Sequence, residues 1–201
     1  MVAGTLTVLI CLSMAVLIQT GWFPFLEEEW GTKKEWLALG LFLEALFLRV
    51  LIPPAGPVQV HVGILMLLPL LNRWWKRRKE NGLMLTSSAF FAGAILFLLR
   101  ELYWIEPVAQ WGGPRGGGLL ITLAVALLSS SSLSDRLMVT VGGMWAGEGM
   151  FLSFHRRELN PVSFGEADFL DFLWSAMVLT LLLHVGFKHA LHWVRNVKGL
   201  T

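Results

Sequence analysis

Charged side chains are scarce in this sequence. Asp, Glu, Lys and Arg make up 15% of its 201 residues, whereas 55% are hydrophobic. Soluble domains carry about 25% charged residues. The chain therefore has too little polar surface to face water on all sides, and the composition indicates a membrane protein.

Cysteine is almost absent, because Cys11 is the single thiol. An internal disulfide is excluded, and no second thiol offers a metal-binding pair. No HExxH or comparable ligand spacing occurs, so we expect no metal and no cofactor. A net charge of +2, spread along the chain, gives no basic patch for nucleic acid.

Long apolar runs are the main feature of the sequence. A membrane-spanning helix needs about 20 residues, and seven runs approach or exceed that length. The chain is therefore predicted to be one integral membrane domain over residues 1–201, an all-α polytopic transmembrane helix bundle of about seven spans, with six as the alternative. The seven predicted segments cover about residues 2–23, 35–52, 57–72, 83–105, 119–133, 138–154 and 169–187.

Three breaks between these segments have clear sequence signals. Pro53 and Pro54 end the second segment, since proline removes a helical amide donor. The glycine-rich stretch at 112–118 is interpreted as a flexible turn, because it lacks the GxxxxGK[ST] pattern of a phosphate loop. Asp135 and Arg136 are predicted to separate the fifth segment from the sixth.

Basic residues indicate the orientation. With seven spans, one side collects 11 of the 16 Lys and Arg residues and the other side 5; if the fifth segment does not cross, the division becomes 9 to 7. Basic loops stay in the cytoplasm. We therefore expect a multi-pass protein of the plasma membrane with its N-terminus outside and its C-terminus in the cytoplasm, an orientation that rests mainly on the cluster at 73–79.

Two glutamates lie near the middle of predicted spans, Glu44 in the second and Glu148 in the sixth. An ionisable group at membrane depth costs on the order of 2.5 kcal/mol or more, so it usually faces a partner, a cavity or an ion path. Glu44 and Glu148 are therefore candidates for binding a substrate or an ion. The alternative is a structural role, in which each glutamate joins helices by hydrogen bonds.

Two histidines inside spans, His61 and His184, are weaker candidates for the same binding role. Each begins a His-Val-Gly triplet, and each glutamate begins a similar five-residue stretch ending in Phe-Leu. Such matches suggest parallel repeats in a 3+1+3 helix arrangement, which some transporters use. The glutamates are 104 residues apart but the histidines 123, so the two offsets disagree.

Small residues in the sixth segment favour close helix packing. Gly143 and Gly147 form a small-xxx-small pair, which lets another helix approach closely. The partners we expect are the lipid bilayer and, through these two glycines, a second copy or another membrane protein.

The overall layout resembles the small YphA-like membrane proteins of Firmicutes. The resemblance is carried by Thr20-Gly21-Trp22 at the end of the first segment and by Arg73-Trp74-Trp75-Lys76 after the third. It implies a small polytopic membrane protein and transfers no functional residue.

Three functions are compatible with these features. The first is a small transporter, or a transport-associated protein, with Glu44 and Glu148 facing a polar interior. The second is a non-catalytic scaffold or assembly factor, whose glutamates only join helices. The third is an intramembrane enzyme acting on lipid, for which no catalytic residues can be named because no nucleophile motif with a histidine partner occurs.

Overall fold

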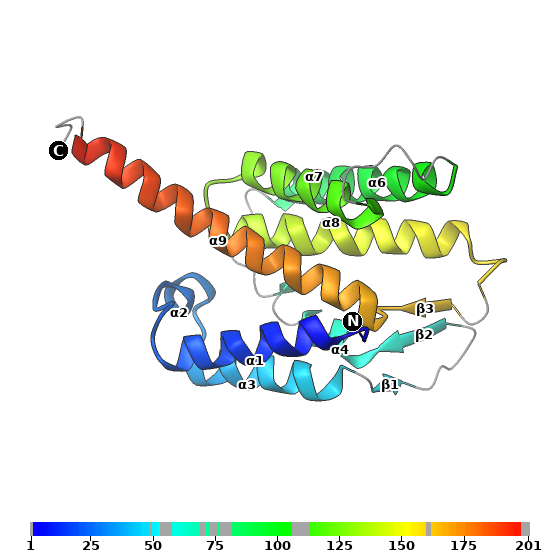
Figure 1. Ribbon diagram of the computed structural model, residues 1–201, viewed down its shortest axis with the longest axis horizontal. Helices are drawn as coiled ribbons and strands as arrows, with labels where there is room; N and C mark the ends of the chain where they lie inside the picture. Colours follow the sequence, from blue (N-terminus) through cyan, green and yellow to red (C-terminus); the bar gives the residue numbers. More distant parts are fainter. Residues whose placement is uncertain are drawn as a thin grey trace.

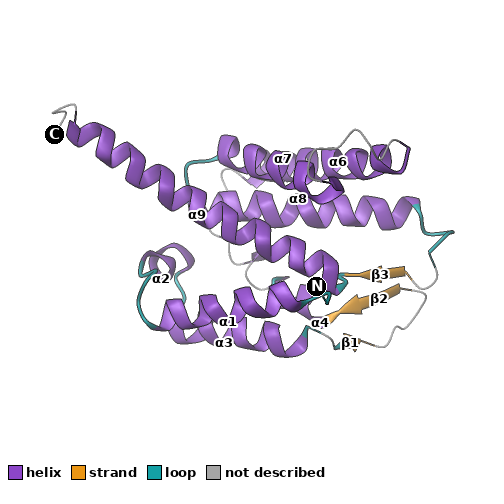
Figure 2. Ribbon diagram, viewed as in Figure 1, coloured by secondary structure: helices purple, strands orange, loops and turns teal. Residues whose placement is uncertain are grey.

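The chain is mostly helical, with a small three-stranded sheet at the end of the molecule where the N-terminus lies (Figure 1, Figure 2). The computed structural model describes residues 2–48, 50–52, 58–68, 71–72, 76, 82–105, 113–159 and 162–197. Most of the basic cluster at 73–79, on which the predicted orientation rests, lies outside these residues.

The first part of the chain forms an antiparallel pair of helices. It consists of α1 (Thr5–Gln19), the short α2 (Phe25–Trp30) and α3 (Lys34–Phe47). Gly31 ends α2 in the left-handed conformation, at φ 55°, which glycine adopts without a steric penalty. α1 and α3 lie side by side (Figure 1). They correspond to the first two predicted segments, although α3 ends before the predicted boundary at Ile52.

A sheet replaces the beginning of the third predicted span, so the all-α prediction is correct for most of the chain but not for this region. The strands are β1 (Leu51–Ile52), β2 (Val58–His61) and β3 (Val162–Phe164), and the short α4 (Val62–Met66) follows β2. β1 is antiparallel to β2, and β2 is parallel to β3. The alternating, β-branched Val58 and Val60 favour an extended strand, and β3 supplies its distant partner.

Four longer helices complete the fold: α6 (Gly82–Ile105), α7 (Gly113–Ser129), α8 (Leu133–Phe154) and α9 (Ala167–Val197). α6, α7 and α8 form one layer, α1 and α3 lie in another, and α9 crosses obliquely toward the C-terminus (Figure 1). The predicted break at Asp135 was wrong. The break comes between Ser129 and Leu133, and Asp135 lies in the first turn of α8, where an acid stabilises the helix dipole.

The predicted flexible turn at 112–118 was also wrong over its described part, because α7 begins at Gly113. One of these glycines, Gly118, has a packing reason to be there. A Cβ on Gly118 would lie 2.7 Å from Cδ2 of Leu96 in α6, whereas a Cβ on Gly117 would meet nothing within 4 Å. Gly118 therefore lets α7 lie close to α6.

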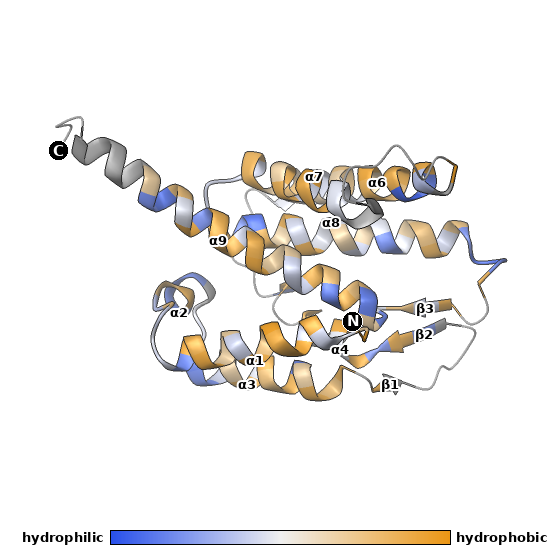
Figure 3. Ribbon diagram, viewed as in Figure 1, coloured by the Kyte–Doolittle hydropathy of each residue, from blue (hydrophilic) through white to orange (hydrophobic). Residues whose placement is uncertain are grey.

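Within the described residues, three helices are long and apolar enough to cross a membrane: Gly82–Tyr103, Leu133–Phe154 and Ala167–Ala190. Thr5–Gln19 and Gly116–Ser129 are shorter apolar helices. Hydrophobic residues predominate along the helices (Figure 3), and large apolar side chains such as Leu83, Phe91 and Leu128 are exposed. Such a surface suits lipid and not water.

Gly143 and Gly147 pack against α6 of the same chain. A Cβ on Gly143 would lie 2.9 Å from Cβ of Ala92, and one on Gly147 would lie 3.0 Å from the carbonyl oxygen of Gly93. The predicted small-residue contact is therefore made between α8 and α6. A contact of these two glycines with a second copy stays a prediction.

Candidate functional site

Glu148 forms an ion pair with Arg100 between α8 and α6. Nη1 of Arg100 donates to Oε2 of Glu148 at 2.7 Å. The guanidinium carbon also lies 3.3 Å from the centre of the Phe151 ring, a cation–π contact one turn further along α8. The Arg100 side chain is 41% exposed but that of Glu148 only 12%. The site therefore has a buried carboxylate end and a cationic end that reaches the surface.

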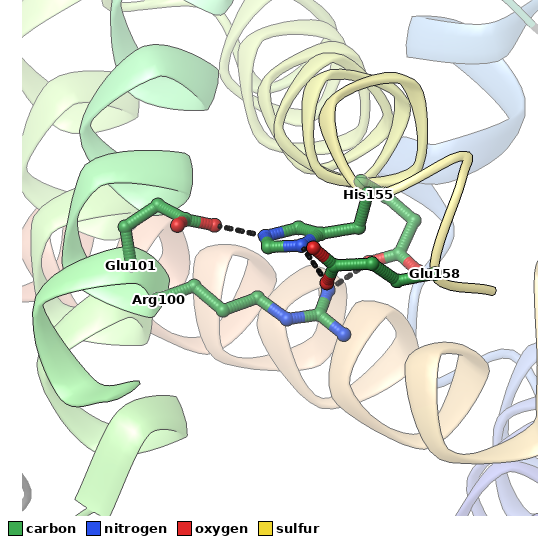
Figure 4. A network of polar contacts seen from close by, with 5 residues as sticks. Arg100, Glu101, His155 and Glu158 are labelled. Carbon is green, nitrogen blue, oxygen red and sulfur yellow. Dashed lines mark hydrogen bonds and ion pairs between the residues drawn. The ribbon is translucent and has the colours of Figure 1, made fainter. Parts of the chain in front are cut away.

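A histidine extends this polar cluster beyond the end of α8. Nε2 of His155 lies 2.8 Å from Oε1 of Glu101, and Nδ1 lies 3.0 Å from Oε2 of Glu158 (Figure 4). An ionised carboxylate only accepts hydrogen bonds, so the ring donates with both nitrogens and is positively charged. These hydrogen bonds, to Glu101 first and Glu158 second, raise the pKa of His155 above its usual value of 6.5.

The polar cluster consists of Arg100, Glu101, Glu148, His155 and Glu158, and it contains both buried and exposed side chains. The exposed fractions are 12% at Glu148, 41% at Arg100, 25% at Glu101, 18% at His155 and 78% at Glu158. Adjacent members are joined by contacts, except that Arg100 and Glu101 are neighbours in sequence. Glu148 is thus linked to the surface by its contact with the exposed Arg100 side chain, an arrangement that can exchange a proton or a small cation with water.

Glu44 has a different environment. It is 1% exposed, and one of its oxygens, Oε1, accepts a hydrogen bond from Nε1 of Trp174 in α9 at 3.3 Å. Its second oxygen, Oε2, is buried and has no hydrogen-bond partner in the described part of the chain. A Cβ on Gly63 would lie 2.8 Å from Oε1, so α4 approaches this carboxyl closely. Glu44 therefore joins three helices.

His184 lies at the other end of the bundle, in α9. It is 2% exposed, and its Nδ1 is 3.0 Å from Nη1 of Arg136 in α8. His61 lies at the end of β2 and has a buried Nδ1 without a partner among the described residues. In that same part of the chain, no hydrogen bond or ion pair joins any two of the four predicted residues.

Sequence reasoning missed Arg100, Glu101 and His155 as members of a site with Glu148. One signal was available, because Arg100 is a basic residue near the end of an apolar segment and is opposite in sign to Glu148. Their separation of 48 positions in the sequence concealed the pairing. The described residues contain no group of three or more His, Cys, Asp or Glu side chains that could hold a metal ion.

The comparison with known protein families agrees with the resemblance noted in the sequence. No curated protein and no solved structure matches the chain. The model of one family, described as YphA-like integral membrane protein, matches residues 22–199. Since this match covers most of the chain, including both glutamates and the whole polar cluster, the chain belongs to the family of YphA-like integral membrane proteins.

Proposed function

We propose that this membrane protein is a small transporter that moves or couples to a proton or a small monovalent cation. Glu148 is the binding carboxylate, and Arg100 is its exchangeable counter-ion. The observation that carries this proposal is the 2.7 Å ion pair between the 12% exposed Glu148 and the 41% exposed Arg100. A carboxylate in a membrane-spanning helix is a functional-site hypothesis by default, and here polar groups connect it to the surface.

The mechanism is an exchange of cations on one carboxylate. When a proton or small cation binds Glu148, the arginine loses its ionic partner. It keeps the ring of Phe151, 3.3 Å from the guanidinium carbon, and its exposed side chain can turn toward water. Departure of the bound cation restores the ion pair. Arg100 therefore neutralises Glu148 when no cation is bound, and in the bound state its own charge is solvated at the exposed end of the site. No carboxylate charge is left unpaired at membrane depth in either state.

The strand pairing supports a duplicated unit. β2 pairs with β3 in parallel, with Val58 opposite Val162 and Val60 opposite Phe164, and paired residues are 104 residues apart along the chain. Glu44 and Glu148 are also 104 residues apart. An offset shared by a strand register and two intramembrane carboxylates is what two copies of one helix–strand–helix unit would produce.

Two further matches follow the same offset. Phe47-Leu48 comes three residues after Glu44, and Phe151-Leu152 comes three residues after Glu148. His61 and His184 do not follow it, so we omit them from the repeat. The units we propose are α3–β2–α4 and α8–β3–α9. Many transporters contain such internal repeats, with binding sites near the interface between them.

The orientation belongs to the same proposal. We expect seven crossings of the plasma membrane, with Met1 outside and the C-terminus in the cytoplasm. The distribution of 11 basic residues on one side and 5 on the other supports it. The test is to introduce a cysteine at Ser163 or at Thr201 and to label intact cells from outside with a thiol reagent that does not cross the membrane. Labelling at Ser163 alone is expected, and labelling at Thr201 would contradict the orientation.

The transport proposal is tested by flux into proteoliposomes that contain the full chain and an internal pH indicator. A potassium diffusion potential drives protons, and sodium or potassium gradients test the alternative cations. Glu148→Gln keeps the size of the side chain but cannot ionise, so flux should fall at least about tenfold, the equivalent of about 1.4 kcal/mol. Glu28→Gln, at an exposed glutamate of α2 outside the polar cluster, is the matched control and should leave flux nearly unchanged. Equal flux in wild type and Glu148→Gln would refute the proposal.

A scaffold function is the second candidate, and the surroundings of Glu44 favour it. The Glu44–Trp174 contact lies beside a hollow lined by apolar side chains that include Met14, Leu137 and Met177. A carboxyl in such surroundings joins helices without meeting water. If no flux is found for any cation, a scaffold that presents its lipid-facing surface to other membrane proteins becomes the better explanation.

A further inference from the structure

A second polar site lies at the end of α8 opposite to Glu148. Its central residue is Arg136, in the first turn of α8. Nε of Arg136 donates to the carbonyl oxygen of Ser130 at 2.7 Å, and Nη1 lies 3.0 Å from Nδ1 of His184 in α9. The arginine therefore connects the turn before α8 with α9.

The contact with Arg136 determines the tautomer of His184. A guanidinium only donates hydrogen bonds, so Nδ1 of the imidazole must accept, and the ring proton is on Nε2. His184 is 2% exposed, and its Nε2 is buried without a hydrogen-bond partner in the described part of the chain. A buried N–H group without an acceptor is costly. An acceptor that the protein does not supply would remove this cost.

Two positive charges lie near the ring of His184, and the first of them belongs to Arg136. No carboxylate of the described residues forms an ion pair with Arg136. Lys188 lies one turn beyond His184 on α9 and adds a second positive charge near the ring.

Glu29 adds a negative charge near the same ring, and the two nearest acids each accept a hydrogen bond from a serine hydroxyl. Asp135 accepts one from Oγ of Ser130 at 2.8 Å, and Glu29 accepts one from Oγ of Ser134 at 3.0 Å. On the membrane side, the hydroxyl groups of Thr140 and Thr180 lie 3.1 Å apart and are both buried. This pair marks the inner limit of the polar site.

We propose that Arg136 and His184 bind a phosphate-type oxyanion, with Lys188 as an additional positive charge. The remaining N–H groups of the guanidinium and Nε2–H of the imidazole are the donors. Arginine suits this ligand because its planar fork matches phosphate oxygens. The source is the phosphate of an anionic lipid headgroup or a free phosphate ion, since the site lies where α8 begins and a basic helix end leaves the bundle. The site does not depend on the transport function.

The test uses the full chain in nanodiscs of phosphatidylcholine, with either phosphatidylglycerol in the bilayer or inorganic phosphate in the buffer. Thermal unfolding gives the stabilisation by each probe, and native mass spectrometry counts retained phosphatidylglycerol. His184→Asn keeps an acceptor at the place of Nδ1 but loses the donor at Nε2. His184→Gln places an amide N–H near Nε2. Arg136→Gln removes the positive charge, and Lys33→Gln, at an exposed lysine, is the control for charge alone.

We expect wild type, His184→Gln and Lys33→Gln to be stabilised, and His184→Asn and Arg136→Gln to bind at least about tenfold more weakly, as loss of about 1.4 kcal/mol implies. Stabilisation only by phosphatidylglycerol identifies a lipid headgroup, and stabilisation by inorganic phosphate identifies a free ion; both support the site. If neither probe stabilises the wild type, or if His184→Asn and His184→Gln respond equally, the proposal is wrong. The two histidine variants decide the question even if Arg136→Gln does not fold.

Discussion

Asp171 caps the first turn of α1 although it lies 164 residues from Thr7 in the sequence. Its Oδ1 accepts hydrogen bonds from the backbone N–H of Thr7 at 2.6 Å and from the Thr7 hydroxyl at 2.7 Å. Its Oδ2 accepts one from the backbone N–H of Gly4 at 2.8 Å. The first N–H groups of a helix have no partner within the helix, so α9 supplies what α1 lacks.

Replacement of Asp171 should therefore destabilise the whole protein. Asp171→Ala leaves two backbone donors and one hydroxyl without an acceptor, and loss of a helix cap costs about 0.5–2 kcal/mol. We expect a lower thermal midpoint in nanodiscs and faster hydrogen exchange in the first turn of α1. Ser175→Ala is the matched control on the same helix, because its hydroxyl only donates to the carbonyl oxygen of Asp171. Equal midpoints for both variants would show that the cap contributes nothing.

The second prediction concerns the close packing of α6 on α8. A Cβ on Gly93 would lie 2.7 Å from Cβ of Ala146 and 2.7 Å from the carbonyl oxygen of Gly143. Gly93→Ala should therefore force the helices apart and cost about 1–3 kcal/mol, as overpacking does. Gly149→Ala, with nothing within 4 Å of the new Cβ, should be neutral or stabilising by up to about 1 kcal/mol. Thermal unfolding of the two variants measures the difference, and a stable Gly93→Ala protein would contradict the packing.

These contacts show which parts of the fold could be predicted from the sequence. The apolar runs predicted the bounds of α6 closely, because a long uninterrupted hydrophobic segment crosses a bilayer as a helix. The sheet was missed because β2 gains its stability from β3, which lies about one hundred residues later. The glycine-rich stretch before Leu119 was misinterpreted as a turn, although it begins α7 and its last glycine, Gly118, allows a close approach of α7 to α6. Local sequence patterns are enough to predict helices, whereas strands and helix caps depend on partners that are distant in the sequence.

The candidate site, too, could be predicted only in part from the sequence. Glu148 could be selected from the sequence, since a carboxylate inside an apolar segment needs an explanation. Its partner Arg100 could not be assigned, because the Arg73, Arg100, Arg115 and Arg136 side chains were all available in sequence terms. The structure selects Arg100 by placing α6 against α8.

A third prediction concerns pH and His155, which lies just beyond the end of α8. Its pKa is raised in the folded protein by hydrogen bonds to Glu101 and Glu158. Stability from the charged ring is therefore fully present below the unfolded pKa of 6.5 and is lost as the pH rises through the folded pKa. The thermal midpoint of wild type should exceed that of His155→Gln at acidic pH, and the two should converge as the pH rises above this window. A constant difference at all pH values would show that the ring is not charged in the folded protein.

The last prediction separates a structural from an ionic role of Glu44. In the wild type, Nε1 of Trp174 lies 3.3 Å from Oε1 of Glu44. A glutamine at this position keeps an oxygen that can accept this hydrogen bond, whereas a leucine has no acceptor. Glu44→Gln should therefore fold with nearly unchanged abundance and thermal midpoint. Glu44→Leu leaves the indole N–H without an acceptor inside the bundle, and this should cost about 1–3 kcal/mol.

The reciprocal change makes this prediction specific to the hydrogen bond. Trp174→Phe removes the donor, so Glu44→Leu should cost less in that background than in wild type, as expected for two residues that interact directly. Thermal unfolding of the four proteins in this double-mutant cycle gives the coupling between the two side chains, and additive losses would show that they do not interact. If Glu44→Gln is stable but abolishes cation flux, its carboxyl acts together with Glu148 in transport. If flux is unchanged in Glu44→Gln and lost in Glu148→Gln, the two proposed units have diverged, one keeping a structural glutamate and the other an ionic one.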